Sequence, residues 1–262
     1  MQKNRNQKNQ TMKVTLLQTD IEWENQQKNI SNAQSMIEQA EPSDLYVLPE
    51  MWTTGFTMQP QALPDDKGVT WMKQTALQHQ CAICGSIATR DSDGRYYNRT
   101  YFVHPDGHAD TYDKHQLFAY GGENECYTPG QKQTIVEYMG YHFMLATCYD
   151  LRFPVWLRNT MDYDVLLIVA NWPKNRHDVW TTLLKARALE NQCYAIGCNR
   201  TGKDPFCEYI GASAVIDAKG RTIGAAETKR QQLLTVDIEL ESLRSFRKKF
   251  NVLADKDRFM LT

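Results

Sequence analysis

Two patterns of hydrophobic residues alternate along the first part of the chain. Short apolar runs at residues 14–18, 45–48 and 81–87 are typical of buried strands. Between them, apolar residues recur with the three- and four-residue spacing of a helix face, at residues 30–40 and 69–76. This alternation predicts a β-α-β-α-β arrangement.

The rest of the chain is richer in strands. Two hairpins are expected, one around the His-Pro-Asp-Gly turn at residues 104–107 and one around the Met-Gly turn at residues 139–140. Further expected elements are strands at residues 165–169, 193–198, 212–216, 222–225 and 233–238, a helix near residues 180–190 and a basic last helix near residues 241–250. No linker rich in Pro, Gly or Ser divides them. The pattern predicts one layered α/β domain over residues 12–262, after a disordered polar extension at residues 1–11.

The composition limits the size of the core, the partners and the cellular compartment that we expect. The chain has 262 residues, of which 42% are hydrophobic, enough for a large core. Its 30 basic and 31 acidic residues are interspersed, so we expect neither nucleic acid nor a membrane as partner. Residues 1–11 have no apolar segment of the kind found in secretion signals. Seven cysteines, an odd number, then favour free thiols in a cytoplasmic protein.

Cys148 stands out among the cysteines by its position. It directly follows the apolar run of residues 142–147 and precedes polar, turn-like sequence, which places it at the end of a buried strand. A free thiol has a pKa near ~8.5, so a catalytic cysteine needs a base or a nearby cation. His142 is excluded as the base, because six extended residues separate it from Cys148 by roughly 20 Å. His115 points away from its neighbour Lys114. His177 is the one histidine left as a base for Cys148, and nothing else in the sequence supports it.

Acidic and basic partners are better candidates. Glu50 repeats the placement of Cys148, since it follows the apolar run of residues 45–48. Lys114 follows the second strand of the first hairpin. Ligands of open α/β sheets gather at the carboxyl ends of strands, so these side chains are expected to share a cleft with Cys148. There a glutamate can transfer protons, and an ammonium can stabilise a thiolate or an oxyanion.

The remaining cysteines and a basic stretch have simpler interpretations. Cys81 and Cys84 have the spacing of a redox motif, but they lie in a strand-like run where core packing is expected instead. The cysteines and histidines show no paired spacing for zinc, so no metal site is expected. The basic stretch at residues 244–249 is expected to be a solvated face or the rim of a dimer.

Three segments carry a resemblance to a known family. Leu-Pro-Glu at residues 48–50, Tyr-Asp-Lys at residues 112–114 and Cys-Tyr-Asp-Leu-Arg-Phe-Pro at residues 148–154 resemble, in order and separation, the signature segments of the nitrilase superfamily, the carbon–nitrogen hydrolases. The similarity runs from about residue 13 to the C-terminal region. It implies a four-layer α-β-β-α sandwich and a homodimer. Residues 117–130 and the Ala-Asn-Trp-Pro segment at residues 170–173 most resemble the omega-amidases, including the YafV-like branch.

The resemblance implies a role for each candidate residue. Glu50 would be the general base and later the acid, and Cys148 would attack an amide carbonyl to form a thioester. Lys114 and the backbone N–H of Tyr149 would hold the oxyanion. Glu123 matches the second glutamate of the family, with Glu125 as the competing choice. No metal or organic cofactor is implied.

The resemblance also suggests a substrate. Omega-amidases hydrolyse the terminal amide of 2-oxoglutaramate and 2-oxosuccinamate, so the pocket must hold an α-keto carboxylate. Arg176 is the candidate for this anion because its guanidinium is a planar, bidentate donor, with His177 behind it. Phe118 and Trp172 are expected to wall the pocket.

Two alternatives differ in class. The first is another carbon–nitrogen hydrolase, acting on a nitrile, an N-carbamoyl compound or a different amide. The second is a thiol-redox or non-enzymatic binding protein, which would leave Glu50 and Lys114 without a function.

Overall fold

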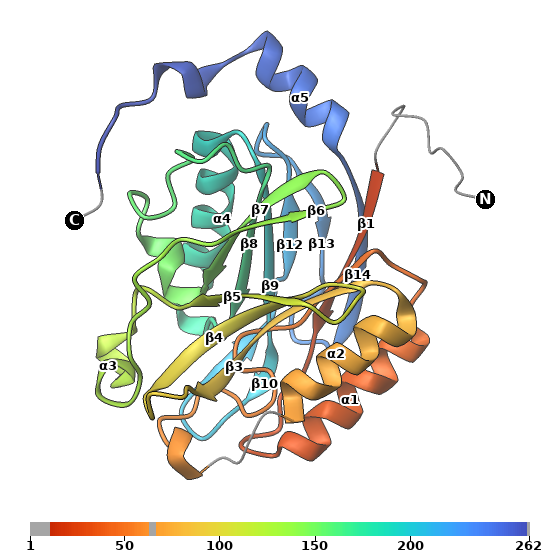
Figure 1. The fold of residues 1–262 in the computed structure, drawn as a ribbon, viewed down its shortest axis with the longest axis vertical. Helices are drawn as coiled ribbons and strands as arrows, with labels where there is room; N and C mark the ends of the chain where they lie inside the picture. The colour runs from red at the N-terminus through yellow and green to blue at the C-terminus, as the bar shows by residue number, and fades with distance from the viewer. Residues whose placement is uncertain (1–10, 63–66, 261–262) are drawn as a thin grey trace.

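Two six-stranded sheets pack face to face in the computed structural model, which describes residues 11–62 and 67–260 (Figure 1). The first sheet has the order β14-β1-β2-β3-β4-β5. Its strands are β1 (Thr11–Gln18), β2 (Leu45–Val47), β3 (Ala82–Arg90), β4 (Tyr96–Val103), β5 (Ala109–Asp113) and β14 (Gln232–Glu239). The neighbours β1, β2 and β3 are parallel, and the other pairs are antiparallel.

The second sheet has the order β13-β12-β9-β8-β7-β6. Its strands are β6 (Ile135–Tyr138), β7 (Tyr141–Thr147), β8 (Val165–Ala170), β9 (Tyr194–Asn199), β12 (Ala214–Ile216) and β13 (Thr222–Ala225). Here β7, β8 and β9 are parallel. A separate hairpin of β10 (Thr201–Lys203) and β11 (Glu208–Ile210) follows β9.

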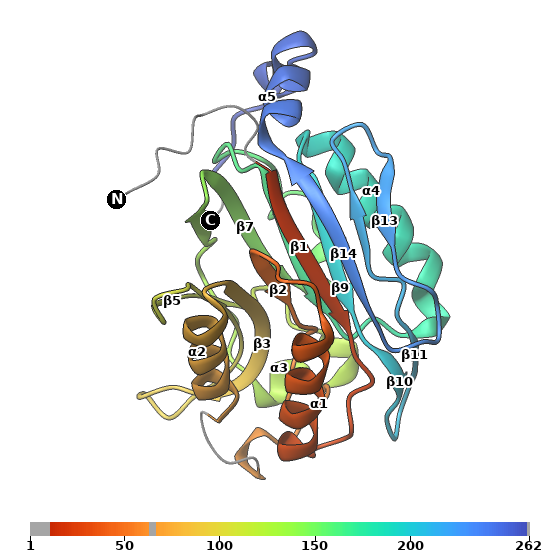
Figure 2. The same ribbon diagram turned by 90° about the vertical axis from the view of Figure 1, so that its right-hand side faces the viewer.

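Helices cover the outer faces of both sheets. Figure 2 shows α1 (Gln26–Gln39) and α2 (Lys67–His79) on one side of the molecule and α4 (His177–Asn191) on the other. The Asn25 side chain caps α1 by accepting a hydrogen bond from the backbone of Lys28. The four layers confirm the predicted α-β-β-α sandwich. The remaining helical segments are α3 (Glu123–Cys126), α5 (Leu240–Lys249) and the 3-10 turns η1 (Pro60–Ala62), η2 (Ala119–Gly121), η3 (Cys148–Arg152), η4 (Lys174–Arg176) and η5 (Val252–Asp255).

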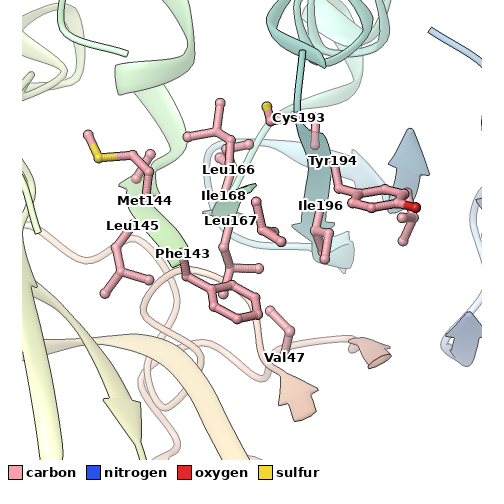
Figure 3. Close-up of a cluster of buried hydrophobic side chains, with 14 of the residues drawn as sticks. Val47, Phe143, Met144, Leu145, Leu166, Leu167, Ile168, Cys193, Tyr194 and Ile196 are labelled. Carbon is pink, nitrogen blue, oxygen red and sulfur yellow. The ribbon is translucent and has the colours of Figure 1, made fainter. Parts of the chain in front are cut away.

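Alternation along the strands divides the core into two parts. Leu16 and Val47 point between the sheets, whereas their neighbours Leu17 and Tyr46 pack under α1 and α2. Figure 3 shows part of the cluster between the sheets, with Val47 lying near Phe143 and Ile196. Apart from the exposed His142, all residues of β7, β8 and β9 are buried, so these strands are apolar over most of their length, as is typical of parallel strands covered on both faces.

The expected elements are present, with small differences. β1 begins at Thr11, one residue inside the predicted extension, and the rest of that extension lies outside the described residues. The hairpin of β10 and β11 and the short helix α3 were not predicted. All seven cysteines have free thiols, and Cys81 and Cys84 are buried, which confirms the core-packing interpretation. No helix within the described ranges is long and apolar enough to cross a membrane.

Candidate active site

Strand ends from both sheets meet at one edge of the sandwich. Glu50 lies three residues beyond β2, and Lys114 directly follows β5. From the other sheet, Cys148 directly follows β7 and Asn171 directly follows β8. Glu50, Lys114, Cys148 and Asn171 line one cavity, so the structure brings together the three residues predicted from strand-end positions.

Lys114 lies between two buried carboxylates. Its Nζ is 2.9 Å from Glu50 Oε1 and 2.8 Å from Glu123 Oε2, and none of the three side chains is exposed to solvent. The backbone N–H of Phe118 also donates to Glu123 Oε2, at 2.6 Å. Glu125 is exposed, so the structure places Glu123 at the lysine and Glu125 away from it. Two carboxylates satisfy one buried ammonium and fix its position.

Two asparagines that sequence reasoning did not select hold the carboxylates. Asn98 Nδ2 donates to Glu50 Oε1 at 2.8 Å and to Glu123 Oε1 at 3.0 Å. Asn171 donates its backbone N–H to Glu50 Oε2 at 2.8 Å and its side-chain amide to the Glu50 carbonyl at 2.7 Å. Asn171 lies inside one of the segments that resemble the family. Asn98 lies in mid-strand β4, where only the pairing of the sheet shows what it faces.

The backbone at two strand ends adopts an uncommon conformation. Cys148 has a φ of 46°, and Met51, directly after Glu50, has a φ of 41°. Such left-handed angles are rare for residues other than glycine and often occur at functional sites. At Cys148 the angle turns the chain sharply from β7 into η3. The nucleophile candidate therefore projects from the turn into the cavity instead of continuing the strand.

Asp150 connects this turn to the loop that follows Lys114 through hydrogen bonds. Its Oδ2 accepts from the Thr147 backbone at 2.9 Å and from the Tyr112 hydroxyl at 2.7 Å, and its Oδ1 accepts from the Gln116 backbone at 2.8 Å. The indole of Trp156 donates to the same Tyr112 hydroxyl at 3.0 Å. These contacts join the end of β5, the loop after Lys114 and the start of η3 into one hydrogen-bonded unit.

Burial and neighbouring charges together set the pKa values of the lysine, the thiol and Glu123. Burial lowers the pKa of Lys114, but the attraction of Glu123 and Glu50 outweighs it, and the net pKa is raised. Burial raises the pKa of Cys148 well above its ordinary value, and the charge of Glu50 raises it further against the opposing effect of Lys114. Burial likewise raises the pKa of Glu123. The resting site therefore holds an ammonium and a protonated thiol, so the thiol needs a base before it can attack.

The cavity at Cys148, which we call the inner cavity, has a volume of about 60 Å³. The predicted residues Tyr149, Phe118, Trp172 and Arg176 line it. Five further lining residues were not predicted: Phe56, Arg152, Pro173, Cys207 and Tyr209.

Two guanidinium groups border the inner cavity. Arg152 lies over the Trp172 ring, 5.3 Å from its centroid, and Arg176 lies over the Phe118 ring at 5.2 Å. Neither guanidinium forms an ion pair with a carboxylate of the described residues. His115, His142 and His177 do not line the cavity, so a cysteine–histidine pair is not formed. Among residues 11–62 and 67–260, no group of three or more His, Cys, Asp or Glu side chains is placed to hold a metal ion.

Comparisons with known proteins agree with this geometry. The carbon–nitrogen hydrolase family model matches residues 13–248. The chain is 41% identical over 254 residues to the omega-amidase YafV of Yersinia enterocolitica, covering 96% of this chain and 99% of that protein. It is 36% identical to the 2-oxoglutaramate amidase of Bacillus subtilis, covering 92% of this chain and 96% of that protein.

A solved structure gives the same result. A carbon–nitrogen hydrolase superfamily protein of Xanthomonas campestris, with an arsenic adduct in its active site, superposes with a TM-score of 0.93. Its sequence is 35% identical, and the match covers 96% of this chain and 99% of that chain. The chain therefore belongs to the carbon–nitrogen hydrolase family, the nitrilase superfamily, as an amidase of the omega-amidase branch.

Proposed function

We propose that this amidase hydrolyses the terminal amide of small dicarboxylic acid monoamides, such as 2-oxoglutaramate and 2-oxosuccinamate, to the acid and ammonia. The observation that carries the proposal is the inner cavity, where Glu50, Lys114 and Cys148 meet beside two guanidinium groups that have no ion-pair partner among the described residues. The relatives named omega-amidase and 2-oxoglutaramate amidase support the same substrate class.

The first half of the proposed reaction forms a thioester. Glu50 takes the proton of the Cys148 thiol as the sulfur attacks the amide carbonyl, which is required because the thiol is protonated at rest. The Lys114 ammonium and the backbone N–H of Tyr149 stabilise the oxyanion of the tetrahedral intermediate. Tyr149 lies at the start of η3, where backbone N–H groups lack a partner within the helix. Glu50 then gives its proton to the departing nitrogen, and ammonia leaves.

The second half releases the acid. Glu50 takes a proton from a water molecule, which attacks the thioester carbonyl, and the Cys148 sulfur leaves as the thiol after the proton returns to it. Glu123 keeps Lys114 in place through both halves, since it bonds to the ammonium through both carboxylate oxygens. No step uses a histidine.

The size of the inner cavity supports a carboxylate contact at its edge. A water molecule needs about 10–15 Å³ of cavity, so about 60 Å³ holds only a few non-hydrogen atoms. The amide and the next carbons of a five-carbon substrate fill it, and the distal carboxylate reaches Arg176 at the border. Arg152, which lines only the inner cavity, is the alternative cation for this anion.

A substrate panel tests the proposal. We expect ammonia release from 2-oxoglutaramate and succinamate, and no turnover of nitriles or N-carbamoyl compounds. A nitrile that is turned over while both amides are not would contradict the omega-amidase assignment. Mass spectrometry of the wild type during turnover is expected to detect an acyl adduct on Cys148, and Cys148→Ala should carry none and release no ammonia.

Kinetic measurements on two variants show which arginine binds the substrate carboxylate. We expect Arg176→Ala to raise KM for 2-oxoglutaramate by about ten- to a hundredfold, because a charge-assisted contact to the carboxylate is lost. Turnover of an uncharged amide such as butyramide serves as the control and should not change. If Arg152→Ala produces this pattern and Arg176→Ala does not, the carboxylate binds at Arg152.

The homodimer and the cytoplasmic location stay predictions.

A further inference from the structure

A second cavity adjoins the inner cavity and takes no part in the chemistry proposed above. It has a volume of about 540 Å³, against about 60 Å³ for the inner cavity, and we call it the outer chamber. Both spaces are lined by Phe56, Phe118, Arg176, Cys207 and Tyr209. A ligand whose amide lies at Cys148 can therefore extend past these shared side chains into the outer chamber.

The other walls of the outer chamber present large aromatic side chains to solvent. Tyr120 is 91% exposed and Phe206 is 79% exposed. Trp23 meets Phe206 edge to face, with ring centroids 5.7 Å apart, and Tyr120 lies 5.9 Å from Phe118. Grouped aromatic side chains that stay exposed in a folded protein mark binding surfaces more often than single exposed ones do.

Phe206 is held in its exposed position by the turn between β10 and β11. Asp204 Oδ1 accepts hydrogen bonds from the backbone N–H groups of Phe206 at 2.8 Å and Cys207 at 2.7 Å. Asp204 Oδ2 accepts from the Tyr209 hydroxyl at 2.6 Å. Because the turn is fixed at three points, the ring is preorganised beside Trp23.

The charges differ between the border of the outer chamber and its exit. Arg176 lies at the border with the inner cavity. The acids beyond it already have partners: Glu24 accepts from the Thr57 hydroxyl at 2.5 Å, and Asp204 is bonded as described. A substrate carboxylate is therefore attracted to Arg176 and repelled by the Glu24 and Asp204 carboxylates further out, whereas an uncharged group can extend along the aromatic rings.

We propose that the outer chamber is a substrate subsite for an aromatic or similarly apolar acyl group carried next to the substrate carboxylate. This inference rests on the proposed function, since it needs the amide at Cys148 and the carboxylate at Arg176. The substrate class consists of amide acids whose α-nitrogen is acylated, such as N-benzoylglutamine. Water converts its terminal amide to N-benzoylglutamate and ammonia by the same thioester route.

The test compares two substrates that differ only in the acyl group. We expect kcat/KM for N-benzoylglutamine to exceed that for N-acetylglutamine by about tenfold, because the phenyl ring is removed from water against the aromatic walls. In Phe206→Ala this ratio should fall to about two or less, since the ring loses a wall. Phe250→Ala is the matched control, because Phe250 is exposed after α5 and lines neither cavity, and it should keep the wild-type ratio.

The outcomes separate this inference from the proposed function. If 2-oxoglutaramate is hydrolysed but N-benzoylglutamine is no better than N-acetylglutamine, the subsite is refuted and the amidase proposal stands. If 2-oxoglutaramate is not hydrolysed, the proposed function fails. If neither acylglutamine is turned over, calorimetry on Cys148→Ala measures how tightly each one binds. Equal affinities refute the subsite. A higher affinity for the benzoyl compound, lost when Phe206→Ala is added, supports it.

Discussion

At the scale of single residues, the Asn98 side chain holds the two carboxylates of the site, because its amide donates to Glu50 and to Glu123. This contact gives a direct test of the carboxylate pair. Asn98→Ala removes the amide that donates to both Glu50 and Glu123, so we expect kcat to fall by about ten- to a hundredfold with little change in KM. Steady-state kinetics on 2-oxoglutaramate measures this. Asn124→Ala, at an exposed position next to Glu123, is the control and should behave as wild type. A changed KM with an unchanged kcat would argue against a positioning role.

Asp150 predicts a pH dependence of stability. Burial raises its pKa from 3.8 to about 6, against the hydrogen bonds that it accepts. The folded state therefore binds more protons than the unfolded state between these values, and the contribution of Asp150 to the free energy of unfolding should fall by about 2 kcal/mol as the pH rises from 4 to 6. The decrease continues through the folded-state pKa of about 6 and levels off roughly one pH unit above it.

Urea unfolding at several pH values checks this. Asp150→Asn should lose the decrease between pH 4 and 6 while showing a lower stability at all pH values, because the amide cannot accept all the hydrogen bonds of the carboxylate. Asp162→Asn, at an exposed acid, should keep the wild-type dependence. The same slope in Asp150→Asn as in wild type would rule out Asp150 as its source.

At the scale of elements, the long strands and helices followed from the sequence, and the short ones did not. β7 to β9 are continuous apolar runs, and α1 and α2 have clear apolar faces. The hairpin of β10 and β11 has three residues in each strand and no apolar run, so no pattern indicated it. This hairpin supplies two walls of the site, Cys207 and Tyr209, which explains why the walls of the pocket were predicted less completely than its three strand-end residues.

Within the site, Glu50, Lys114 and Cys148 could be predicted because each follows a strand, where side chains face a cleft. Glu123 was identified only through the resemblance to a family. Asn98 was missed because it lies within β4, and the alternation of a strand does not tell which buried polar group it meets.

Gly130 provides a prediction about the end of β5. A side chain at this position would place its Cβ 2.0 Å from the Asp113 carbonyl oxygen, and the Gly130 N–H donates to the Lys114 carbonyl at 2.9 Å. Gly130→Ala should therefore push Lys114 out of place and lower both stability and kcat. Gly107→Ala, in the turn between β4 and β5, should cost only about 1 kcal/mol for its left-handed backbone and leave activity intact. Full activity in Gly130→Ala would show that the loop can adapt.

At the scale of the whole molecule, the two sheets depend on each other. Phe143 of β7 is fully buried between them, next to Phe102 of β4, with ring centroids 5.4 Å apart. Each sheet brings part of the site: Glu50 and Lys114 come from one, Cys148 and Asn171 from the other. The distances within the site are therefore set by how the sheets pack, a long-range property that no local sequence pattern encodes.

The packing between the sheets can be weakened at one ring. Phe143→Ala should lower the free energy of unfolding by about 3–5 kcal/mol, because it leaves a cavity between the sheets. Chemical denaturation measures the change. Phe250→Ala, with its ring exposed, should change it by no more than about 0.5 kcal/mol. A loss below about 1 kcal/mol for Phe143→Ala would mean that the sheets close over the missing ring.

The left-handed backbone at Cys148 creates a conflict between the activity of this protein and its stability. Outside glycine such an angle costs about 1–2 kcal/mol, and the candidate site bears this cost twice, at Cys148 and at Met51. Glycine would relieve the cost at position 148 and remove the proposed nucleophile in the same step. Selection of random variants for heat resistance alone should therefore favour inactive proteins with Cys148→Gly, and a screen for a more robust enzyme must score catalysis in every round.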